Sequence, residues 1–305
     1  MTDASLIPQA QPIGTYPATT LPVALPSIMG ILNVTPDSFS DGGLFFAAEA
    51  ATTHALEMVR QGASIVDVGG ESTRPGAEPL PLEEELRRVI PVIEAIADPL
   101  RAAGAVISID TYKAAVARRA VAAGATMIND ISALRFDPEM AAVAAESGHT
   151  ICLMHMQGEP RTMQERPHYD NVVDEVRAFL EGRLAFAVGA GVREEQIVLD
   201  PGIGFGKTAR HNLLLLRYLH RLTELGRPIL LGTSRKRFLG VVLKSEVPTD
   251  RVVGTVASTV IGFLQGAAIF RVHDVGANAD ALTVTRAIAT AGATDPVGET
   301  VGETG

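Results

Sequence analysis

Cysteine is scarce in this chain of 305 residues, and basic residues are missing from its first part. The chain contains one cysteine, Cys152, and its first lysine or arginine is Arg60. A single cysteine excludes an internal disulfide framework and is typical of a reducing compartment, and its place in an apolar run predicts core packing. Because a secretory signal begins with basic residues, we expect a cytoplasmic protein.

The chain also lacks an excess of positive charge and a segment typical of a membrane span. With 26 basic and 35 acidic residues its net charge is -9, which argues against non-specific binding to nucleic acid or to an anionic membrane. One uncharged run, residues 252–270, is long enough to be considered as a span. It contains hydroxyl and amide side chains and three glycines, so we expect a buried helix followed by a strand.

Eight short apolar runs, each ending abruptly in charged, amide or glycine residues, organise the sequence. Stretches with helical periodicity lie between them, so strand and helix alternate, which indicates a parallel sheet. Eight such units over about 250 residues predict one (β/α)8 TIM barrel. The runs with their polar exits are residues 29–43, 65–76, 106–113, 126–132, 151–158, 197–208, 229–238 and 269–274.

The alternation is uninterrupted, so we expect a single barrel domain over residues 26–291. Residues 1–25 are rich in proline, threonine and alanine without apolar periodicity, and residues 292–305 also lack such a pattern. We therefore expect a flexible tail at each end.

Barrel enzymes carry their chemistry on the loops that follow the strands, so the polar exits should converge on one mouth. The first exit, residues 33–43, is longer than a strand-to-helix connection needs and contains proline and two glycines, which predicts a mobile lid. Cations gather at the exits although the chain as a whole is acidic, so we expect an anionic ligand. These cations are Arg74, Lys113, Lys207, Arg235, Lys236, Arg271 and His273.

Polar residues after the third and fourth runs are candidates for the ligand site. Asp110 and Asn129 each follow an apolar run directly. Asp130 and Ser132 come next, and a role as caps of the following helix is as good an interpretation as a role in the site. The acidic residues at 83–85 are typical of a solvated first turn of a helix, where carboxylates suit the dipole.

The fifth and sixth exits superficially resemble two familiar kinds of site. Cys152 and His155 lack the second cysteine or histidine cluster that a zinc site needs. Residues 200–208, DPGIGFGKT, resemble a phosphate-binding P-loop, but Pro201 stands where the template needs its first glycine. The sequence therefore argues against a zinc site and against nucleotide triphosphate hydrolysis.

The same two exits supply apolar contacts for a flat ligand. In a strand, Met154 and Met156 point the same way, opposite to His155, and their thioethers suit an aromatic ring. The glycines after Asp200 permit close backbone approach, and Phe205 is placed to pack on a ligand ring.

The last two exits supply further cations. Residues 234–237 read Ser-Arg-Lys-Arg shortly after an apolar strand, so at least one of the three cations should point into the mouth. Arg271 and His273 are two residues apart and therefore lie on one face of an extended segment.

Eight motifs lie in order along the chain: ILNVTPDSFSDGG, DVGGESTRPGA, SIDTYK, INDIS, LMHMQG, LDPGIGFGK, GTSRKRF and RVHDV. In this order they resemble the dihydropteroate synthases, the folate-pathway enzymes that sulfonamides inhibit, and the resemblance covers residues 27–289. It implies condensation of 6-hydroxymethyl-7,8-dihydropterin pyrophosphate with 4-aminobenzoate, which releases pyrophosphate and 7,8-dihydropteroate. It also implies a homodimer formed through helices on the outside of the barrel.

The resemblance implies roles for individual residues as well. Those expected to hold the pterin are Asp110, Asn129, Asp200 and Lys236, with Arg271 flat against the ring and Met154 and Phe205 as apolar contacts. Those expected around the pyrophosphate are Asn33, Arg74, Arg271 and His273, with a Mg2+ ion bound to Asn33. Those expected around the aminobenzoate are Thr73, Arg74, Pro75, Ser234 and Lys236. The residues expected to be catalytic are Arg271, His273, Arg74 and Lys236.

In the mechanism that these placements imply, pyrophosphate departs first and the aniline nitrogen attacks the resulting carbocation, so no strong general base is needed. Two other interpretations stay open. A methyltetrahydrofolate-dependent methyltransferase shares a pterin-binding barrel but has no use for the pyrophosphate-binding cations. A non-catalytic pterin-binding paralogue predicts damage at the lid or at the arginine and histidine of the last exit, and the sequence shows none.

Overall fold

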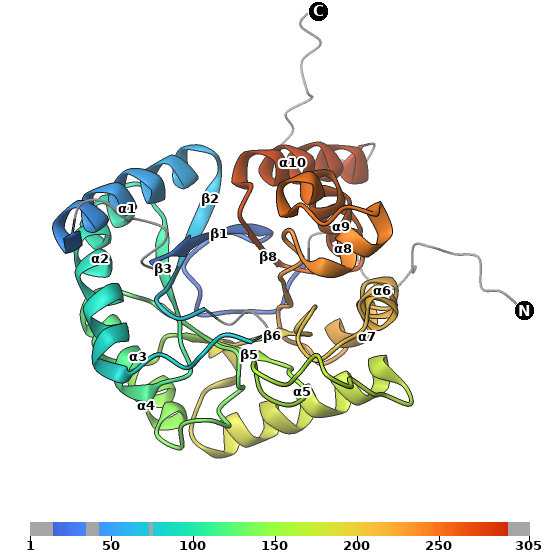
Figure 1. The fold of residues 1–305 in the computed structure, drawn as a ribbon, viewed down its shortest axis with the longest axis horizontal. Helices are drawn as coiled ribbons and strands as arrows, with labels where there is room; N and C mark the ends of the chain where they lie inside the picture. Colours follow the sequence, from blue (N-terminus) through green and yellow to red (C-terminus); the bar gives the residue numbers. More distant parts are fainter. Residues whose placement is uncertain (1–14, 35–42, 73–75, 292–305) are drawn as a thin grey trace, which may run out of the picture.

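The computed structural model describes residues 15–34, 43–72 and 76–291. Within these ranges eight parallel strands form a ring, and helices surround it (Figure 1). Strand and helix alternate along the chain, and the predicted (β/α)8 barrel is confirmed. The strands are β1 (Ser27–Asn33), β2 (Ala63–Gly69), β3 (Val106–Asp110), β4 (Met127–Asp130), β5 (Thr150–Met154), β6 (Ile197–Asp200), β7 (Leu230–Leu231) and β8 (Ile269–Val272).

The barrel closes between β6 and β7. Backbone hydrogen bonds join the strands in the order β6-β5-β4-β3-β2-β1-β8-β7. The two ends of this sheet meet where Leu199 and Ile229 form an isolated parallel bridge, and the N–H of Leu199 donates to the carbonyl of Pro228 at 3.0 Å. Because every pairing is parallel, all eight strands end at the same rim, and the residues that follow them meet there.

The helices cover the outside of the ring. In α2 the apolar side chains recur at helical spacing, so Val89, Ile93 and Ile96 form one buried stripe that faces the sheet. The helices of the described residues are α1 (Gly43–Arg60), α2 (Leu82–Ala102), α3 (Ala114–Ala122), α4 (Met140–Ser147), α5 (Val172–Gly189), α6 (Ala209–Arg217), α7 (His220–Thr223), α8 (Arg237–Leu243), α9 (Val252–Leu264) and α10 (Val275–Thr290), with 3-10 turns at η2 (Glu194–Gln196) and η3 (Pro248–Arg251).

The uncharged run at residues 252–270 folds as predicted, as helix α9 followed by strand β8. Thr255, Ser258 and Thr259 are buried within α9, and each of their hydroxyl groups makes a hydrogen bond. Among the described residues, no helix is both long enough and apolar enough to cross a membrane.

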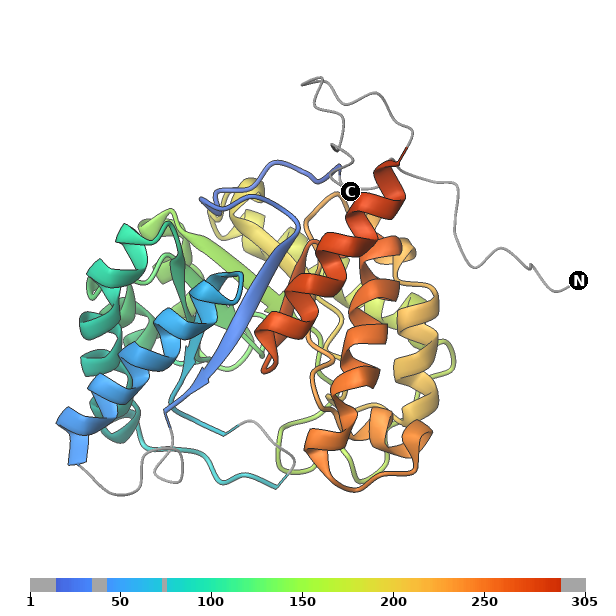
Figure 2. The same ribbon diagram turned by 90° about the horizontal axis from the view of Figure 1, so that it is seen from above.

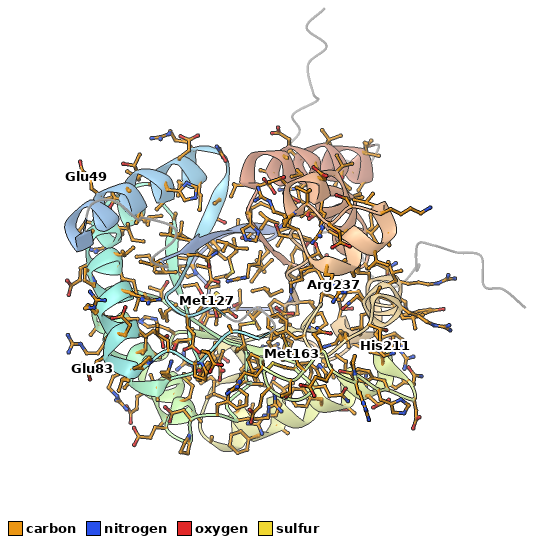
Figure 3. All side chains as sticks on the ribbon, in the orientation of Figure 1. Glu49, Glu83, Met127, Met163, His211 and Arg237 are labelled. Carbon is orange, nitrogen blue, oxygen red and sulfur yellow. The ribbon has the colours of Figure 1, made fainter. Side chains whose placement is uncertain are left out.

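At the end of the barrel where the strands begin, the interior is apolar. Met29, Met127 and Cys152 belong to one buried cluster of inward-pointing side chains. Figure 3 shows Met127 inside the ring, whereas Glu49 and Glu83 lie on its outer surface. Cys152 is fully buried, as its place in an apolar run predicts.

The segment before β1 closes this end of the barrel. Leu21 is 4% exposed and packs into the apolar cluster, with Tyr16 and Val23 beside it. The N–H of Thr20 donates to the carbonyl of Glu195 at 2.8 Å, which ties the segment to the turn before β6. Figure 2 shows the segment crossing the end of the barrel opposite to the one at which β1 stops. The other end, where the strands stop, is therefore the one left to bind a ligand.

The expected tails are described only in part. Within the expected N-terminal tail, Tyr16, Leu21, Val23 and Leu25 pack against the barrel, because scattered apolar side chains without periodicity can still fill the open end of a barrel. Residues 1–14 and 292–305 lie outside the described residues, and the division into one domain with two tails stays a prediction.

Candidate active site

Five polar side chains meet inside the barrel near the rim where the strands stop. Asp110 on β3 is the register partner of Asn129 on β4, and Asp200 ends β6. Asp67 on β2 and Arg271 on β8 complete the group. Four of the five are residues that the motifs assign to the pterin, and the structure brings them together. The fifth, Asp67, is not among the site residues predicted from the sequence.

The guanidinium of Arg271 is held between two buried carboxylates. Its Nε donates to Oδ2 of Asp67 and its Nη2 to Oδ2 of Asp110, each at 2.6 Å. The amide of Asn129 donates to the same oxygen of Asp67 at 3.1 Å. Arg271 therefore ties β8 to β2 and β3, and two ion pairs fix the plane of its guanidinium.

Burial makes this network electrostatically strong. Burial alone would lower the pKa of Arg271, but Asp67 and Asp110 outweigh it and raise that pKa, so the guanidinium stays charged. Burial also raises the pKa of Asp110 above its usual range, although the charge of Arg271 opposes the shift. The three charges lie in a region of low dielectric, where each pairing is stronger than it would be in water.

Asp200 and Lys236 form a second polar group of the mouth. Oδ1 of Asp200 accepts the N–H of Gly202 at 2.6 Å. Nζ of Lys236 donates to the carbonyl of Ile203 and lies 4.7 Å from the centre of the Phe205 ring. Burial lowers the pKa of Lys236 to about 8, and the charge of Asp200 opposes that shift. The loop after β6 thus presents a carboxylate, a carbonyl and an aromatic ring to one lysine.

The two arginines beside Lys236 lie elsewhere. Arg235 forms a two-bond pair with Asp274, with Nη2 to Oδ1 at 2.5 Å and Nε to Oδ2 at 2.9 Å. Arg237 begins helix α8 and is exposed. Of the three cations in this exit, Lys236 is the one that lies with the site residues.

Ser234 and His273 are neighbours at the rim. The hydroxyl oxygen of Ser234 accepts the N–H of His273 at 3.0 Å and lies 2.9 Å from its Nδ1. The hydroxyl group can donate to Nδ1 or accept from it, depending on the tautomer of the imidazole. Ser234 is buried and thereby fixes the position of the partly exposed imidazole.

Lys113, another cation of the exits, is held within the fold. Its Nζ pairs with Glu71 and with Glu85, the second at 2.5 Å. Glu85 is 1% exposed, so the acidic run at residues 83–85, which we expected to be solvated, is buried at its third residue. Lys113 therefore pairs with carboxylates of its own chain, as Arg235 does with Asp274.

Apolar side chains line one side of the mouth. Met154, Met156 and Met163 belong to one buried cluster, against which Phe205 packs. His155 points the other way, as the alternation of an extended segment predicts, and its ring packs among aromatic side chains behind β5. The mouth therefore combines polar groups on several strands with a wall of thioethers.

Asn33 ends β1 beside Gly69, its register partner on β2. A Cβ atom on Gly69 would lie 3.5 Å from Cβ of Asp110 and 3.8 Å from Oδ1 of Asn33, so the glycine leaves room between these two side chains. The remaining predicted site residues lie outside the described residues, as does most of the expected lid. The site residues are Thr73, Arg74 and Pro75, and the lid residues are 35–42.

Asp130 supports the loop after β4. Its carboxylate accepts the N–H of Ser132 at 2.8 Å and that of Leu134 at 2.7 Å. Ala133 and Leu134 have φ angles of 52° and 65°, which are unfavourable for residues with a side chain. Of the two roles considered for Asp130, a cap describes the structure better than a role in the ligand site. Asp130 caps this strained turn, however, and not helix α4.

Asp67 is the site residue that sequence reasoning missed. It lies inside β2, with apolar residues on both sides, rather than at the end of a run. It has no exposed surface, and its Oδ1 has no hydrogen-bond partner among the described residues. A carboxylate within an apolar strand was the sequence signal that could have revealed Asp67. A carboxylate is rarely buried unless a partner that pairs with it lies beside it.

The mouth thus joins a deep network of carboxylates, an apolar wall and cations close to the rim. A (β/α)8 barrel with such a mouth belongs to the class of enzymes that bind a flat heterocycle with polar edges and an anionic substituent. In agreement with this class, the chain matches the family of pterin binding enzymes over residues 29–273.

Individual relatives narrow the family further. The chain is 45% identical over 271 residues to the dihydropteroate synthase of Haemophilus influenzae, which covers 89% of this chain and 97% of that protein. Two structures of Xanthomonas albilineans dihydropteroate synthase, one with 4-aminobenzoic acid and one with 7,8-dihydropteroate, give TM-scores of 0.80 and 0.76 at 49% and 46% identity, each over 86% of this chain and 93% of that chain. The chain belongs to the pterin-binding enzymes and, within them, to the dihydropteroate synthases.

The network around Arg271 predicts an effect of neutralising Asp67. Asp67→Asn keeps the shape of the side chain but removes one of the two charges that hold the guanidinium, so dihydropteroate synthase activity should fall at least tenfold, roughly the effect of losing one charged hydrogen bond. Asp98→Asn makes the same chemical change in an exposed pair with Arg101 and should leave activity unchanged in the same steady-state assay. Equal activity of the two variants would contradict the role given to Asp67.

Proposed function

We propose that the protein condenses 6-hydroxymethyl-7,8-dihydropterin pyrophosphate with 4-aminobenzoate to form 7,8-dihydropteroate and pyrophosphate at the site described above. Membership of the dihydropteroate synthases supports this reaction, and so do the ligands in the Xanthomonas albilineans structures. The observation that carries the proposal is the pair of buried carboxylates around Arg271, because it sets acceptors for a heterocycle deep in the barrel and a fixed cation beside them.

The pterin ring fits the deep half of the mouth. A carboxylate accepts paired hydrogen bonds from an amino group and a neighbouring ring N–H, and Asp200 is placed to do so. Asp110 and Asn129 offer a carboxylate and an amide from the adjoining strands. Lys236 donates to the ring carbonyl and to a ring nitrogen in this arrangement. Together the four residues form hydrogen bonds with the polar edge of the pterin.

The two faces of the pterin meet different surfaces. Arg271 lies flat against one face as a guanidinium plane, while Met154 and Phe205 supply apolar contact. Asp67 and Asp110 already fix the plane of the guanidinium in the absence of ligand. Stacking on it therefore requires little further ordering of the side chain.

The pyrophosphate belongs near the rim, beside Arg271 and His273, and Arg74 joins them in this proposal. The chemistry of Asn33 fits a magnesium ion carried by the substrate, because Mg2+ is commonly bound by one or two protein oxygens together with phosphate oxygens and water. Among the residues that the structure describes, no cluster of three His, Cys, Asp or Glu side chains would hold a metal without substrate. Bound there, Mg2+ supplies Lewis acidity to the leaving group.

Bond breaking precedes bond making in the mechanism that we propose. Arg271 and His273 donate hydrogen bonds to the departing pyrophosphate and disperse the negative charge that develops on it. The C–O bond breaks, and the positive charge left on the methylene carbon delocalises into the pterin. The aniline nitrogen then attacks that carbon and loses a proton to solvent, so no side chain has to act as a strong general base.

The aminobenzoate lies next to Lys236, Phe205 and Ser234 in this arrangement. Nζ of Lys236 is 4.7 Å from the centre of the Phe205 ring, so the lysine borders both substrates. The sequence motifs add Thr73, Arg74 and Pro75, which lie outside the described residues. A methyltetrahydrofolate-dependent methyltransferase, the alternative enzyme, has no leaving anion that would use the cations at this rim.

Pyrophosphate release with and without 4-aminobenzoate tests the reaction. With Mg2+ and both substrates, we expect release coupled to formation of dihydropteroate. Arg271→Ala and His273→Ala should each lower kcat at least tenfold, an order of magnitude expected for removing one donor to the leaving group. Arg118→Ala, which changes an exposed arginine paired with Glu146, is the control and should not. Tight pterin binding without turnover by the wild type would identify a non-catalytic pterin-binding protein instead.

The pKa of Lys236 predicts a basic limit for pterin binding. The ammonium is the form that donates to the pterin, and it is lost as the pH rises through about 8. The Kd of the pterin pyrophosphate, measured by calorimetry, should therefore rise above that pH. In Lys236→Arg the guanidinium keeps its charge, so binding should be weaker but free of this dependence. An affinity of Lys236→Arg that declines over the same pH interval would contradict the assignment.

Two chains pair, in our proposal, through helices α9 and α10. These helices lie side by side on the outside of the barrel (Figure 2) and expose Val253, Val284 and Ile288 by 76, 58 and 72%. Apolar side chains exposed along two neighbouring helices favour an interface with a partner. Sedimentation equilibrium should give twice the chain mass of 32.1 kDa. Val253→Asp should yield a monomer, whereas Phe186→Asp on α5 should not, and a monomeric wild type would refute the pairing.

A cytoplasmic location is also part of the proposal. The chain has a single cysteine, Cys152, which is buried and has no second cysteine with which to form a disulfide. This supports a reducing compartment. Recovery of the protein in the membrane or exported fraction after cell fractionation would contradict it.

A further inference from the structure

Lys207 is a buried lysine that the reaction proposed above does not use. It follows the glycine-rich loop at residues 201–206 and is 3% exposed. Its Nζ lies 2.8 Å from Nδ1 of His155 and donates to the carbonyls of Gly202 and Phe205, each at 2.9 Å. Within the described part of the chain, no carboxylate forms an ion pair with it. Burying an ammonium without such a partner is costly unless its donors are satisfied.

The surroundings of Lys207 match the needs of an ammonium group. An ammonium has three N–H bonds, and four acceptors lie within hydrogen-bond distance of Nζ, the most distant being the carbonyl of His155 at 3.5 Å. Burial and the charge of Lys207 hold the pKa of His155 far below its usual value, so the ring is neutral and its Nδ1 is able to accept. Burial also lowers the pKa of Lys207 well below its usual value; the charge of Asp200 opposes that shift and the charge of Lys236 adds to it.

The glycines of the loop allow it to curl around this ammonium. Gly202 and Gly206 have φ angles of +64° and +61°. A Cβ on Gly202 would lie 1.8 Å from the carbonyl oxygen of His155, and one on Gly206 would lie 2.5 Å from that of Gln157. A side chain at either position would push the loop away from the end of β5. The segment that resembles a P-loop therefore encloses a cation of its own chain, where a P-loop encloses an anion.

The same loop shapes the pterin site. The N–H of Gly202 donates to Asp200, and the carbonyl of Ile203 accepts from Lys236. Two lysines are thus bound to one short loop, Lys207 beside the buried His155 ring and Lys236 beside the mouth. A change in the shape of the loop would displace acceptors that both lysines use.

The charge of Lys207 also acts on Asp200. Burial raises the pKa of Asp200 above its usual value. The groups that oppose this shift are Lys236, the N–H of Gly202, Lys207 and Arg271, in decreasing order. A carboxylate must be ionised to accept two hydrogen bonds from a pterin. Removing Lys236, Lys207 or Arg271 should therefore favour the protonated form of Asp200, which binds pterin less well.

We propose that Lys207 is a positioning residue for pterin binding, which holds the loop at residues 201–206 in its curled shape and places a positive charge behind the carboxylate of Asp200. The inference rests on the pterin-binding role proposed for Asp200. Lys207 itself does not touch the substrate. Lys207 acts through Asp200 and through the carbonyl of Ile203, which accepts a hydrogen bond from Lys236.

Lys207→Met, compared with Tyr169→Phe, tests this inference. Methionine keeps most of the apolar stem but removes the charge, whereas Tyr169→Phe removes an uncharged hydrogen bond to the carbonyl of Gly206 on the same loop. For Lys207→Met we expect the KM and Kd of the pterin pyrophosphate to rise about tenfold, with kcat changed less than about threefold. The acid limb of pterin binding should also move to higher pH, because Asp200 then protonates more readily.

Tyr169→Phe should leave that acid limb in place. An unmoved limb in Lys207→Met, or an equal shift in Tyr169→Phe, would overturn the inference, because the shape of the loop alone would then explain the effect. Failure of the proposed function looks different, since the wild type would then make no dihydropteroate. Should Lys207→Met not fold, Lys207→Gln keeps donors for the two carbonyls without the charge and is measured in the same way. Should neither fold, nitrogen NMR of Nζ in the wild type decides, and a neutral amine at the pH of the assay would overturn the inference.

Discussion

The pairing of Arg271 with Asp67 and Asp110 is the interaction on which the rest of the site depends. A parallel barrel fills its interior with side chains from all of its strands, and a charge placed there is tolerated only when it is paired. Here one guanidinium pairs with carboxylates from two neighbouring strands, and the amide of Asn129 donates to the same oxygen of Asp67 as the guanidinium does. Loss of any partner would leave the others uncompensated away from water. The polar half of the barrel interior is therefore stable only as a unit.

The position of these groups on strands also explains how the part of the site proposed to bind pterin is organised before a ligand arrives. Backbone hydrogen bonds on both sides of β3 and β4 fix Asp110 and Asn129, and the loop after β6 is fixed from below by Lys207. Lys236 precedes helix α8 and is anchored on the same loop. Groups that are already in place lose little freedom on binding, so more of the interaction free energy is available to hold the substrate.

Much of this arrangement could be predicted from the sequence because a parallel barrel leaves a strong pattern. Apolar runs that stop at polar residues located the strands, and parallel strands stop at one rim, so Asp110 and Asn129 could be grouped without coordinates. The direction of long side chains could not be predicted. Lys113 and Lys207 stand at the expected exits but turn to partners 42 and 52 residues away, and spacing along the chain carries no information on such contacts. Asp67 was overlooked for the same reason, since its partner on β8 is 204 residues away.

The burial of the charged groups suits the proposed reaction. Asp67, Asp110 and Asp200 are 0, 9 and 5% exposed, whereas the side chain of Arg271 is 21% exposed and His273 is also partly exposed. The three carboxylates are therefore more buried than the guanidinium of Arg271. A uniformly positive mouth would bind pyrophosphate but would destabilise a cationic pterin, and a uniformly negative mouth would do the reverse. In the mechanism proposed above, the pterin develops positive charge next to carboxylates while the departing anion meets the Arg271 guanidinium and the His273 imidazole.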